Sequence, residues 1–304
     1  MKRAARRDRF GWKSRWPNTS LSSQGAIACL HARHGTIRGR LCRRIEGESM
    51  DMGLKDKVVL ITGGGGGIAR GIERAFATEG AKFILTDLFP GGLEAAKEEL
   101  ERDFGSEVFT ILANGSVEEE VRAAVEAGAE HFGGRIDVLI NNAQASASGL
   151  TLVQHSEEDF DLAVRSGLYA TFFYMKHAYP YLKETAGSVI NFASGAGIGG
   201  NPGQSSYAAA KEGIRGMSRV AASEWGPDNI NVNIVCPIVM TKALEEWRER
   251  EPEMYEKNVK AIPLGRFGDA EKDVGRVCVF LASPDASFVT GDTIMVQGGS
   301  GMKP

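Results

Sequence analysis

Residues 57–80 read KVVLITGGGGGIARGIERAFATEG, and this stretch decides the fold of the 304-residue chain. A continuous apolar run ends in five glycines, and a helical pattern that stops at Gly80 follows. Glycine between a buried strand and a helix lets backbone N–H groups approach a pyrophosphate, which the positive end of the helix dipole also favours. The stretch therefore predicts a strand–loop–helix unit that binds a dinucleotide.

Six further apolar runs alternate with helical stretches along the rest of the chain. Their interiors are continuous Val, Ile, Leu and Phe, which is typical of strands buried on both faces of a parallel sheet. Helices ending at Gly105 and Gly133 separate some of these runs, as in βαβ units. We therefore expect one α/β domain over residues 51–304, a Rossmann-like doubly wound parallel sheet with strands at 57–62, 81–87, 107–112, 136–142, 187–194, 230–237 and 292–298.

Residues 1–50 differ from this body in charge. They carry 12 Lys and Arg against 3 acids, whereas the rest carries 24 against 36. This leader has no apolar run long enough for a signal peptide or a membrane span. It could be a targeting or basic interaction tail, a nucleic-acid-binding arm, or upstream sequence translated from a start codon before Met50. We favour the last, because the globular pattern begins directly after Met50 and Met52, and we expect neither nucleic acid nor membrane as a partner.

The cysteines and histidines predict no metal site. Four widely separated cysteines form no CxxC pair, so neither a zinc site nor a disulfide framework is indicated. They are typical of isolated thiols in a reducing compartment, and we expect a cytoplasmic protein. Metal-ligand spacing is also absent among three histidines of the body, His131, His155 and His177.

Asp87 ends the second predicted strand, twenty residues after Gly67. A carboxylate there accepts hydrogen bonds from the adenosine ribose hydroxyls of a dinucleotide, or else only caps the strand. It would also repel a 2′-phosphate, and no Lys or Arg stands at Leu88, at Phe89 or in the glycine run to neutralise one. The sequence therefore predicts NAD(H) rather than NADP(H).

Ser194, Tyr207 and Lys211 form the predicted catalytic set. Tyr207 and Lys211 are four residues apart and share one helix face, so that the ammonium should lower the pKa of the phenol and make it usable for proton transfer. The same spacing occurs in Ser166, Tyr179 and Lys183. That second set lies along one expected helix, which would place Ser166 and Tyr179 about 20 Å apart and unable to share a substrate oxygen.

These motifs resemble the short-chain dehydrogenase/reductase family over 54–299. The resemblance implies that Tyr207 is the general acid/base, that Lys211 lowers its pKa and binds the nicotinamide ribose, and that Ser194 donates to the substrate oxygen. Hydride would move between the nicotinamide and a carbinol carbon. Besides Tyr207 and Lys211, the implied cofactor-binding residues are Gly63, Gly66, Gly67, Ile68, Asp87, Leu88, Asn114, Gly115, Asn142, Ala143, Pro237, Val239 and Thr241.

Four positions depart from the family pattern. Ala69 replaces the last loop glycine, Gln144 the glycine after Asn142-Ala143, and Ile238 the glycine after Pro237. Gly167 stands where the family usually has an asparagine that supports a water-linked proton relay to the lysine. Glycine within a helix costs about 1 kcal/mol relative to alanine, so we expect a local compensation such as a kink or a water, and an altered relay.

The segment 240–263 resembles the family's substrate lid. An apolar inner face is expected, unless these helices simply pack on the core; its members would be Met240, Leu244, Trp247, Met254, Tyr255 and Val259. We predict an NAD-dependent dehydrogenase of an apolar, fairly bulky secondary alcohol or ketone, with cyclic and steroid-like compounds among the candidate substrates. The alternatives are a 3-oxoacyl-type reductase and an NAD-binding protein with little turnover. The resemblance also implies a homo-oligomer, a dimer or tetramer, paired through helices in 157–183 and 205–226.

Overall fold

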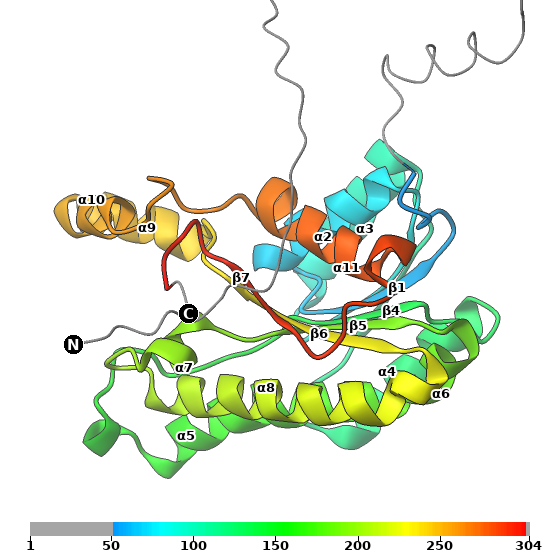
Figure 1. Ribbon diagram of the computed structural model, residues 1–304, viewed down its shortest axis with the longest axis horizontal. Helices are drawn as coiled ribbons and strands as arrows, with labels where there is room; N and C mark the ends of the chain where they lie inside the picture. The colour runs from blue at the N-terminus through cyan, green and yellow to red at the C-terminus, as the bar shows by residue number, and fades with distance from the viewer. Residues whose placement is uncertain (1–50, 302–304) are drawn as a thin grey trace, which may run out of the picture. The chain divides into compact units, whose positions relative to one another are not determined.

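The computed structural model describes residues 51–301, and the basic extension expected at 1–50 lies outside them. Within the described chain the seven predicted strands form one parallel sheet in the order β3-β2-β1-β4-β5-β6-β7 (Figure 1). The prediction of a doubly wound α/β fold is confirmed. The strands are β1 (Val58–Thr62), β2 (Lys82–Asp87), β3 (Val108–Leu112), β4 (Val138–Asn141), β5 (Ser188–Phe192), β6 (Asn231–Pro237) and β7 (Thr293–Val296).

Helices cover both faces of the sheet (Figure 1). One layer contains α2 (Gly67–Thr78), α3 (Pro90–Phe104) and α11 (Arg276–Ala282), and the other contains α4 (Glu118–His131), α6 (Ala170–Thr185) and α8 (Ser205–Trp225). Side chains of β1 alternate between the two resulting cores, with Val59 and Ile61 in one and Val58 and Leu60 in the other. This two-sided burial explains the unbroken apolar runs in the sequence.

The predicted helix stops at Gly80 and Gly105 have a conformational basis. Both glycines have positive φ, +77° and +66°, a region that side-chain-bearing residues rarely adopt. The Gly105 N–H donates to the carbonyl of Glu101 at 3.1 Å and closes the end of α3. Short 3₁₀ turns complete other connections; they are η2 (Leu152–Gln154), η4 (Gly226–Asp228) and η6 (Pro284–Ala286).

The helix expected over 157–183 contains a change of pitch. α5 (Glu157–Ala163) leads into a π-helical segment, η3 (Val164–Tyr169), before α6 begins at Ala170. A second π segment, η5 (Ala270–Gly275), precedes α11. π segments in helices are rare and occur frequently at functional sites. The glycine-rich connection after Ser194 likewise contains a short helix, α7 (Gly195–Gly199), instead of the loop that its composition suggested.

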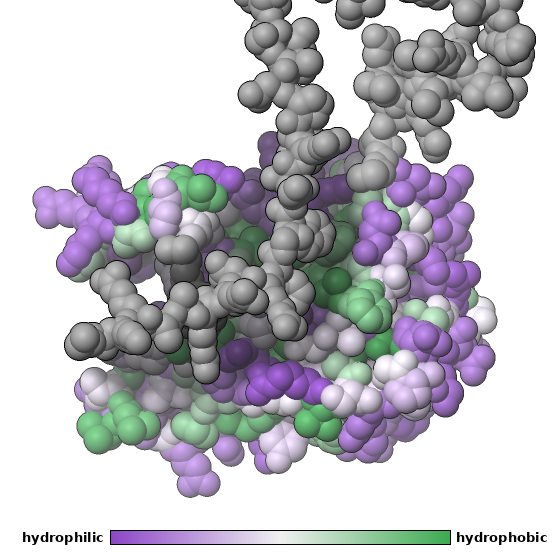
Figure 2. Space-filling model, in the orientation of Figure 1, coloured by the Kyte–Doolittle hydropathy of each residue, from purple (hydrophilic) through white to green (hydrophobic). Residues whose placement is uncertain are grey.

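Two helices between β6 and β7 stand away from the sheet (Figure 1). They are α9 (Lys242–Arg250) and α10 (Pro252–Lys260), and hydrophilic residues gather on their outer end (Figure 2). Of the helices formed by residues 51–301, none combines the length and the apolar character that a membrane crossing requires.

Candidate active site

The glycine loop connects β1 to α2 and lies against β2. The N–H groups of Gly63 and Gly64 both donate to the carbonyl of Thr86, at 2.8 and 3.1 Å. Gly63 and Gly67 have positive φ, +69° and +59°, so glycine is required there by conformation. At Gly65 glycine is required by space, because a Cβ atom would lie 2.9 Å from a carboxylate oxygen of Asp87.

Asp87 is fixed by the backbone around it. Its Oδ2 accepts from the N–H of Gly65 at 2.9 Å, and its Oδ1 accepts from the N–H groups of Leu88 and Phe89 at 2.6 and 3.1 Å. The carboxylate therefore joins the end of β2 to the glycine loop. It has a defined position before any ligand arrives, which reduces the ordering cost of binding.

A cavity of about 380 Å³ opens at this edge of the sheet, around the β1/β4 boundary where the strand order reverses. That boundary is where open α/β sheets bind their ligands. The lining includes ten of the predicted cofactor-binding residues, from Gly63 to Ala143 in the chain; they are Gly63, Gly66, Gly67, Ile68, Asp87, Leu88, Asn114, Gly115, Asn142 and Ala143. The structure thus brings these ten together.

The other predicted cofactor residues lie outside the lining of this cavity. Pro237 ends β6, Val239 is buried just after it, and the Thr241 side chain caps the start of α9 by accepting from the N–H of Leu244 at 3.3 Å. Several lining residues were not predicted. They include Thr62, Thr86, Ser116 and Tyr174, and also Gln144, which the sequence singled out only as a departure from the family pattern.

The three predicted catalytic residues come from two neighbouring elements. Ser194 lies two residues beyond β5 and begins α7, while Tyr207 and Lys211 lie one turn apart at the start of α8. Lys211 is buried and donates from Nζ to the carbonyl of Phe192 at 2.7 Å. Its Nζ is 5.6 Å from the centre of the Tyr207 ring. The phenol and the amine are therefore neighbours, as their spacing predicts.

The pKa values of this pair differ from the expectation. Burial raises the pKa of Tyr207 above its usual value, and a hydrogen bond with Ser194 opposes that rise. Burial also lowers the pKa of Lys211 to about 8, because the ammonium loses its hydration. The expectation that Lys211 holds the pKa of Tyr207 below its usual range is wrong for the unliganded protein, since desolvation is the largest effect on both groups.

The second Tyr/Lys pair has a structural role. The Tyr179 hydroxyl donates to Asp228 at 2.7 Å, and Lys183 pairs with the same carboxylate at 3.0 Å. The hydroxyl of Ser166, which shares the spacing, instead accepts from the N–H of Ala145 at 3.0 Å and has two backbone carbonyls as acceptors for its proton, Leu162 at 2.6 Å and Ala145 at 3.0 Å. These contacts are structural, as predicted for this set. The Ser166 hydroxyl bonds to backbone groups, so it does not replace the asparagine that the family has at position 167.

The helices α9 and α10 hold a partly buried apolar stripe. Leu244, Trp247, Tyr255 and Val259 are half-buried, and the rings of Trp247 and Tyr255 lie 6.0 Å apart. Met254, which was expected on the inner face, is 51% exposed. Four of the six side chains expected on the inner face of the segment are therefore partly buried on α9 and α10, whereas Met254 faces solvent.

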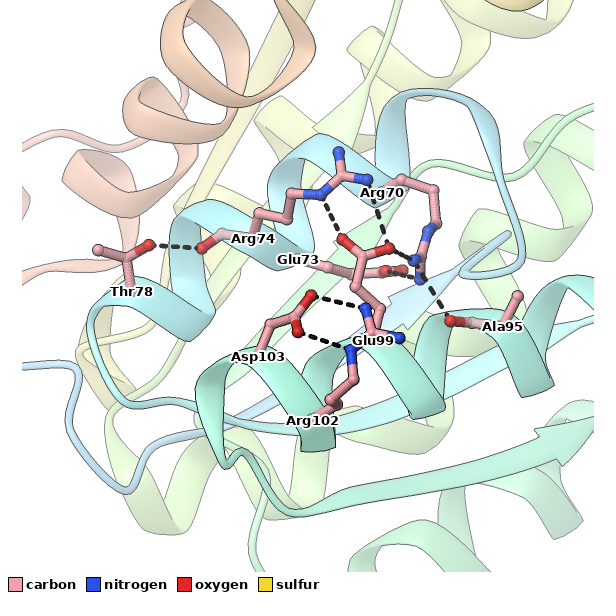
Figure 3. Close-up of polar contacts among 8 residues, drawn as sticks. All are labelled: Arg70, Glu73, Arg74, Thr78, Ala95, Glu99, Arg102 and Asp103. Carbon is pink, nitrogen blue, oxygen red and sulfur yellow. Dashed lines mark hydrogen bonds and ion pairs between the residues drawn. The ribbon is translucent and has the colours of Figure 1, made fainter.

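Glu73 on α2 was not singled out from the sequence. It is fully buried behind the glycine loop, where its Oε1 would lie 3.3 Å from a Cβ at Gly64. It pairs with Arg70 at 3.0 Å, and Arg70 and Arg74 both bind Glu99 of α3 (Figure 3). Burial raises the pKa of Glu73 to about 8, against the opposing effect of Arg70. Only tertiary packing reveals this cluster.

Replacing Glu73 by glutamine should change how stability depends on pH. The folded chain holds a proton on Glu73 up to about pH 8, whereas the unfolded chain releases it near pH 4.5, so folding stability falls as pH rises through this window. We expect Glu73→Gln to match the wild type near pH 5 and to exceed its free energy of unfolding by roughly 1–4 kcal/mol near pH 8.5. Urea unfolding at both pH values measures this, with the exposed Glu101→Gln as control. Equal stabilities at pH 8.5 would contradict it.

Among residues 51–301, no group of three or more His, Cys, Asp or Glu side chains is placed to hold a metal ion. His131 and His177 lie beside Glu107 and Glu118, at 3.3 and 3.1 Å. His155 contacts the hydroxyl groups of Ser205 and Ser206 at the start of α8.

Comparison with known proteins gives consistent results. A family profile described as enoyl-(acyl carrier protein) reductase matches residues 64–301. The chain is 56% identical to the 12alpha-hydroxysteroid dehydrogenase of a Clostridium species over 260 residues, 83% of this chain and all of that protein. It is 38% identical to the 3-oxoacyl-[acyl-carrier-protein] reductase of Thermotoga maritima, over 82% of this chain and 99% of that one. The crystal structure of levodione reductase superimposes with a TM-score of 0.76 at 35% identity, over 81% and 98%.

Proposed function

Because the chain belongs to the short-chain dehydrogenase/reductase family and is an oxidoreductase, we propose that it interconverts a steroid hydroxyl and ketone with NAD(H) as its cofactor. The observation that carries the steroid assignment is the 56% identity over the whole length of a 12alpha-hydroxysteroid dehydrogenase. The half-buried apolar stripe on α9 and α10 supports it, since a steroid needs apolar surface around its rings.

The residues around the cavity fit a dinucleotide. Gly66 and Gly67 line the cavity, and a Cβ on either would have no protein atom within 4 Å, so the space beside this part of the loop is open. Asp87 is placed to accept hydrogen bonds from ribose hydroxyls, and its charge disfavours a 2′-phosphate. Leu88 and Phe89, both exposed beside it, offer no compensating cation. These features support NAD(H) over NADP(H).

The chemistry then divides between the cofactor and three side chains. NAD⁺ supplies the hydride acceptor when bound. In the oxidation direction the Tyr207 phenolate oxygen takes the hydroxyl proton of the substrate as the carbinol carbon gives up its hydride, and reduction reverses both transfers. Ser194 donates a hydrogen bond to the same substrate oxygen, and Lys211 places a cation beside the phenol ring. Donors held in place stabilise charge that develops on that oxygen.

A 3-oxoacyl reductase activity is the second candidate. The Thermotoga maritima relative, named for that activity, is 38% identical to this chain, well below the 56% of the steroid relative. An NAD-binding protein without turnover is less well supported, because Ser194, Tyr207 and Lys211 lie on adjoining elements with the Lys211 amine beside the Tyr207 ring.

Steady-state kinetics of the full chain test the proposal. We expect NAD⁺ reduction with a 12α-hydroxysteroid, and a kcat/KM at least about tenfold above that for 3β- or 7α-hydroxysteroids or for a short secondary alcohol. NADH oxidation with a 3-oxoacyl thioester should be slower still. Turnover of the thioester alone would replace the steroid proposal by the second candidate, and NADH binding without turnover on any of these would favour a binding role.

The proposal includes assembly through the helices that the family resemblance implies. Tyr169, Phe172 and Val220 are 45%, 43% and 56% exposed on η3, α6 and α8. Such large apolar side chains on one helical layer support pairing of two subunits there.

A further inference from the structure

Gln144 carries a polar atom that the structure leaves without a partner. The residue follows β4 and lines the cavity next to Asn142 and Ala143. Its Oε1 is buried and has no hydrogen-bond partner among residues 51–301, and its Nε2 reaches the carbonyl of Ala163 only at 3.5 Å. A buried acceptor without a partner destabilises the folded state, because it gives up its hydrogen bond to water and gains none. Such a cost at a ligand cavity requires an explanation.

The Gln144 carboxamide lies against the Cα of Gly167, in the space that any side chain at position 167 would fill. A Cβ on Gly167 would lie 2.6 Å from both Cδ and Oε1 of Gln144, closer than Cβ atoms approach other groups. Gly167 has no positive φ, so space and not conformation accounts for this glycine. A side chain at 167 would therefore displace the Gln144 carboxamide from this position.

The Gln144–Gly167 contact lies between the cofactor cavity and the catalytic helix. Gly167 belongs to η3, whose Leu168 packs on Gly213 of α8, where a Cβ would lie 2.8 Å from the leucine. Gly213 is two residues beyond Lys211. On the loop side, Ser166 bonds both backbone groups of Ala145. Loop 142–145, η3 and α8 are therefore packed on one another in series.

We propose that Gln144 is a positioning residue for the dehydrogenase: its carboxamide, seated on Gly167, sets the distance between the cofactor loop 142–145 and the helix that carries Tyr207 and Lys211. The inference rests on the proposed function for its kinetic readouts. It also identifies the compensation expected for the glycine at 167, because an amide from the loop fills the space that a side chain on the helix would take.

A double-mutant cycle tests the contact itself. In the wild-type background Gly167→Ala forces the carboxamide away, and we expect the dissociation constant for NADH to rise and kcat to fall, each by about tenfold, since displacements near 1 Å have large effects on catalysis. In a Gln144→Ala background the space is vacant, so Gly167→Ala should change both quantities less than about twofold. Gly91→Ala, on a helix with open space around it, is the control. Equal effects in both backgrounds would overturn the proposal.

A second variant separates volume from polarity. Gln144→Met keeps the length of the side chain and loses the amide. We expect its melting temperature to stay within a few degrees of the wild type, while kcat falls about tenfold and its pH profile moves, because methionine loses the Nε2 contact with the Ala163 carbonyl, at 3.5 Å, that fixes the side chain on Gly167. Unchanged kcat, pH profile and NADH affinity would reduce Gln144 to a packing residue. NADH binding, followed by fluorescence, remains informative even if no steroid is turned over, so failure of the proposed function stays distinguishable.

Discussion

Replacing Tyr207 by phenylalanine should lower kcat for steroid oxidation by about 10²- to 10⁴-fold, the usual contribution of a positioned acid/base group. The ring and its contact with Lys211 remain, so only the proton acceptor is lost. NADH affinity should change much less than kcat, because the Tyr207 ring keeps its place beside Lys211 and only the hydroxyl is removed. Stopped-flow or steady-state assays with a fluorescence titration measure both quantities.

Tyr179→Phe is the matched control for this experiment. It removes a hydroxyl from the other Tyr/Lys pair in the chain, one bound to Asp228 and remote from the catalytic set in sequence and contacts. That variant should retain wild-type kcat. If Tyr207→Phe kept more than about a tenth of the wild-type kcat, another group would have to take the proton.

The pKa of Tyr207 also predicts how the activity of the wild type depends on pH. Because burial raises the pKa of Tyr207, the phenolate becomes populated only on the alkaline side of its ordinary range. Oxidative kcat/KM, which reports the unliganded enzyme, should therefore rise with pH from neutrality into the alkaline range, and this rise should disappear in Tyr207→Phe.

Replacing Asp87 by asparagine should change the preference for NAD⁺ over NADP⁺ by about 100-fold or more. Repulsion between a fixed carboxylate and a 2′-phosphate makes the binding free energy of NADP⁺ less favourable by several kcal/mol. Each 1.4 kcal/mol corresponds to about a factor of ten in affinity. The variant also has one acceptor oxygen in place of two, so the bond from the N–H of Gly65 is lost. That loss should weaken the binding of NAD⁺ and NADP⁺ to the same extent. The ratio of the two kcat/KM values therefore isolates the charge effect.

Asp103→Asn is the control, since Asp103 pairs with Arg102 at the exposed end of α3. It should leave the ratio unchanged. A wild-type protein that already prefers NADP⁺ would overturn the assignment of NAD(H), whereas a small change in the ratio would mean that the 2′-phosphate lies elsewhere than beside Asp87.

Much of the fold could be predicted because its signals are local. Each strand is a mostly apolar run, and glycines such as Gly105 end helices where positive φ is needed. The positions of the glycine loop, Asp87 and the proposed catalytic set could be predicted, since each combines a residue type with a strand end or a helix start. Parallel strands bring all of those positions to one edge of the sheet.

What escaped prediction depends on contacts between distant segments. Gln144 and Gly167 look like two separate departures in the sequence, and only the packing of a loop on a π-helical segment shows that they share one space. The burial of Glu73 behind the glycine loop and the pKa of Tyr207 are likewise tertiary properties. Spacing along the chain places two side chains on one helix face, but desolvation, which decides these pKa values, depends on everything packed around them.

The strand order makes the two recognition tasks separable. Asp87 belongs to β2, on one side of the β1/β4 boundary, whereas the helices α9 and α10 follow β6 on the other side. Substitutions that share no partner and lie far apart have nearly additive free energies. Under the proposed function, changes at the end of β2 and changes in α9 and α10 should therefore have nearly independent effects on cofactor and substrate preference, so that the two sets of variants can be screened separately and then combined.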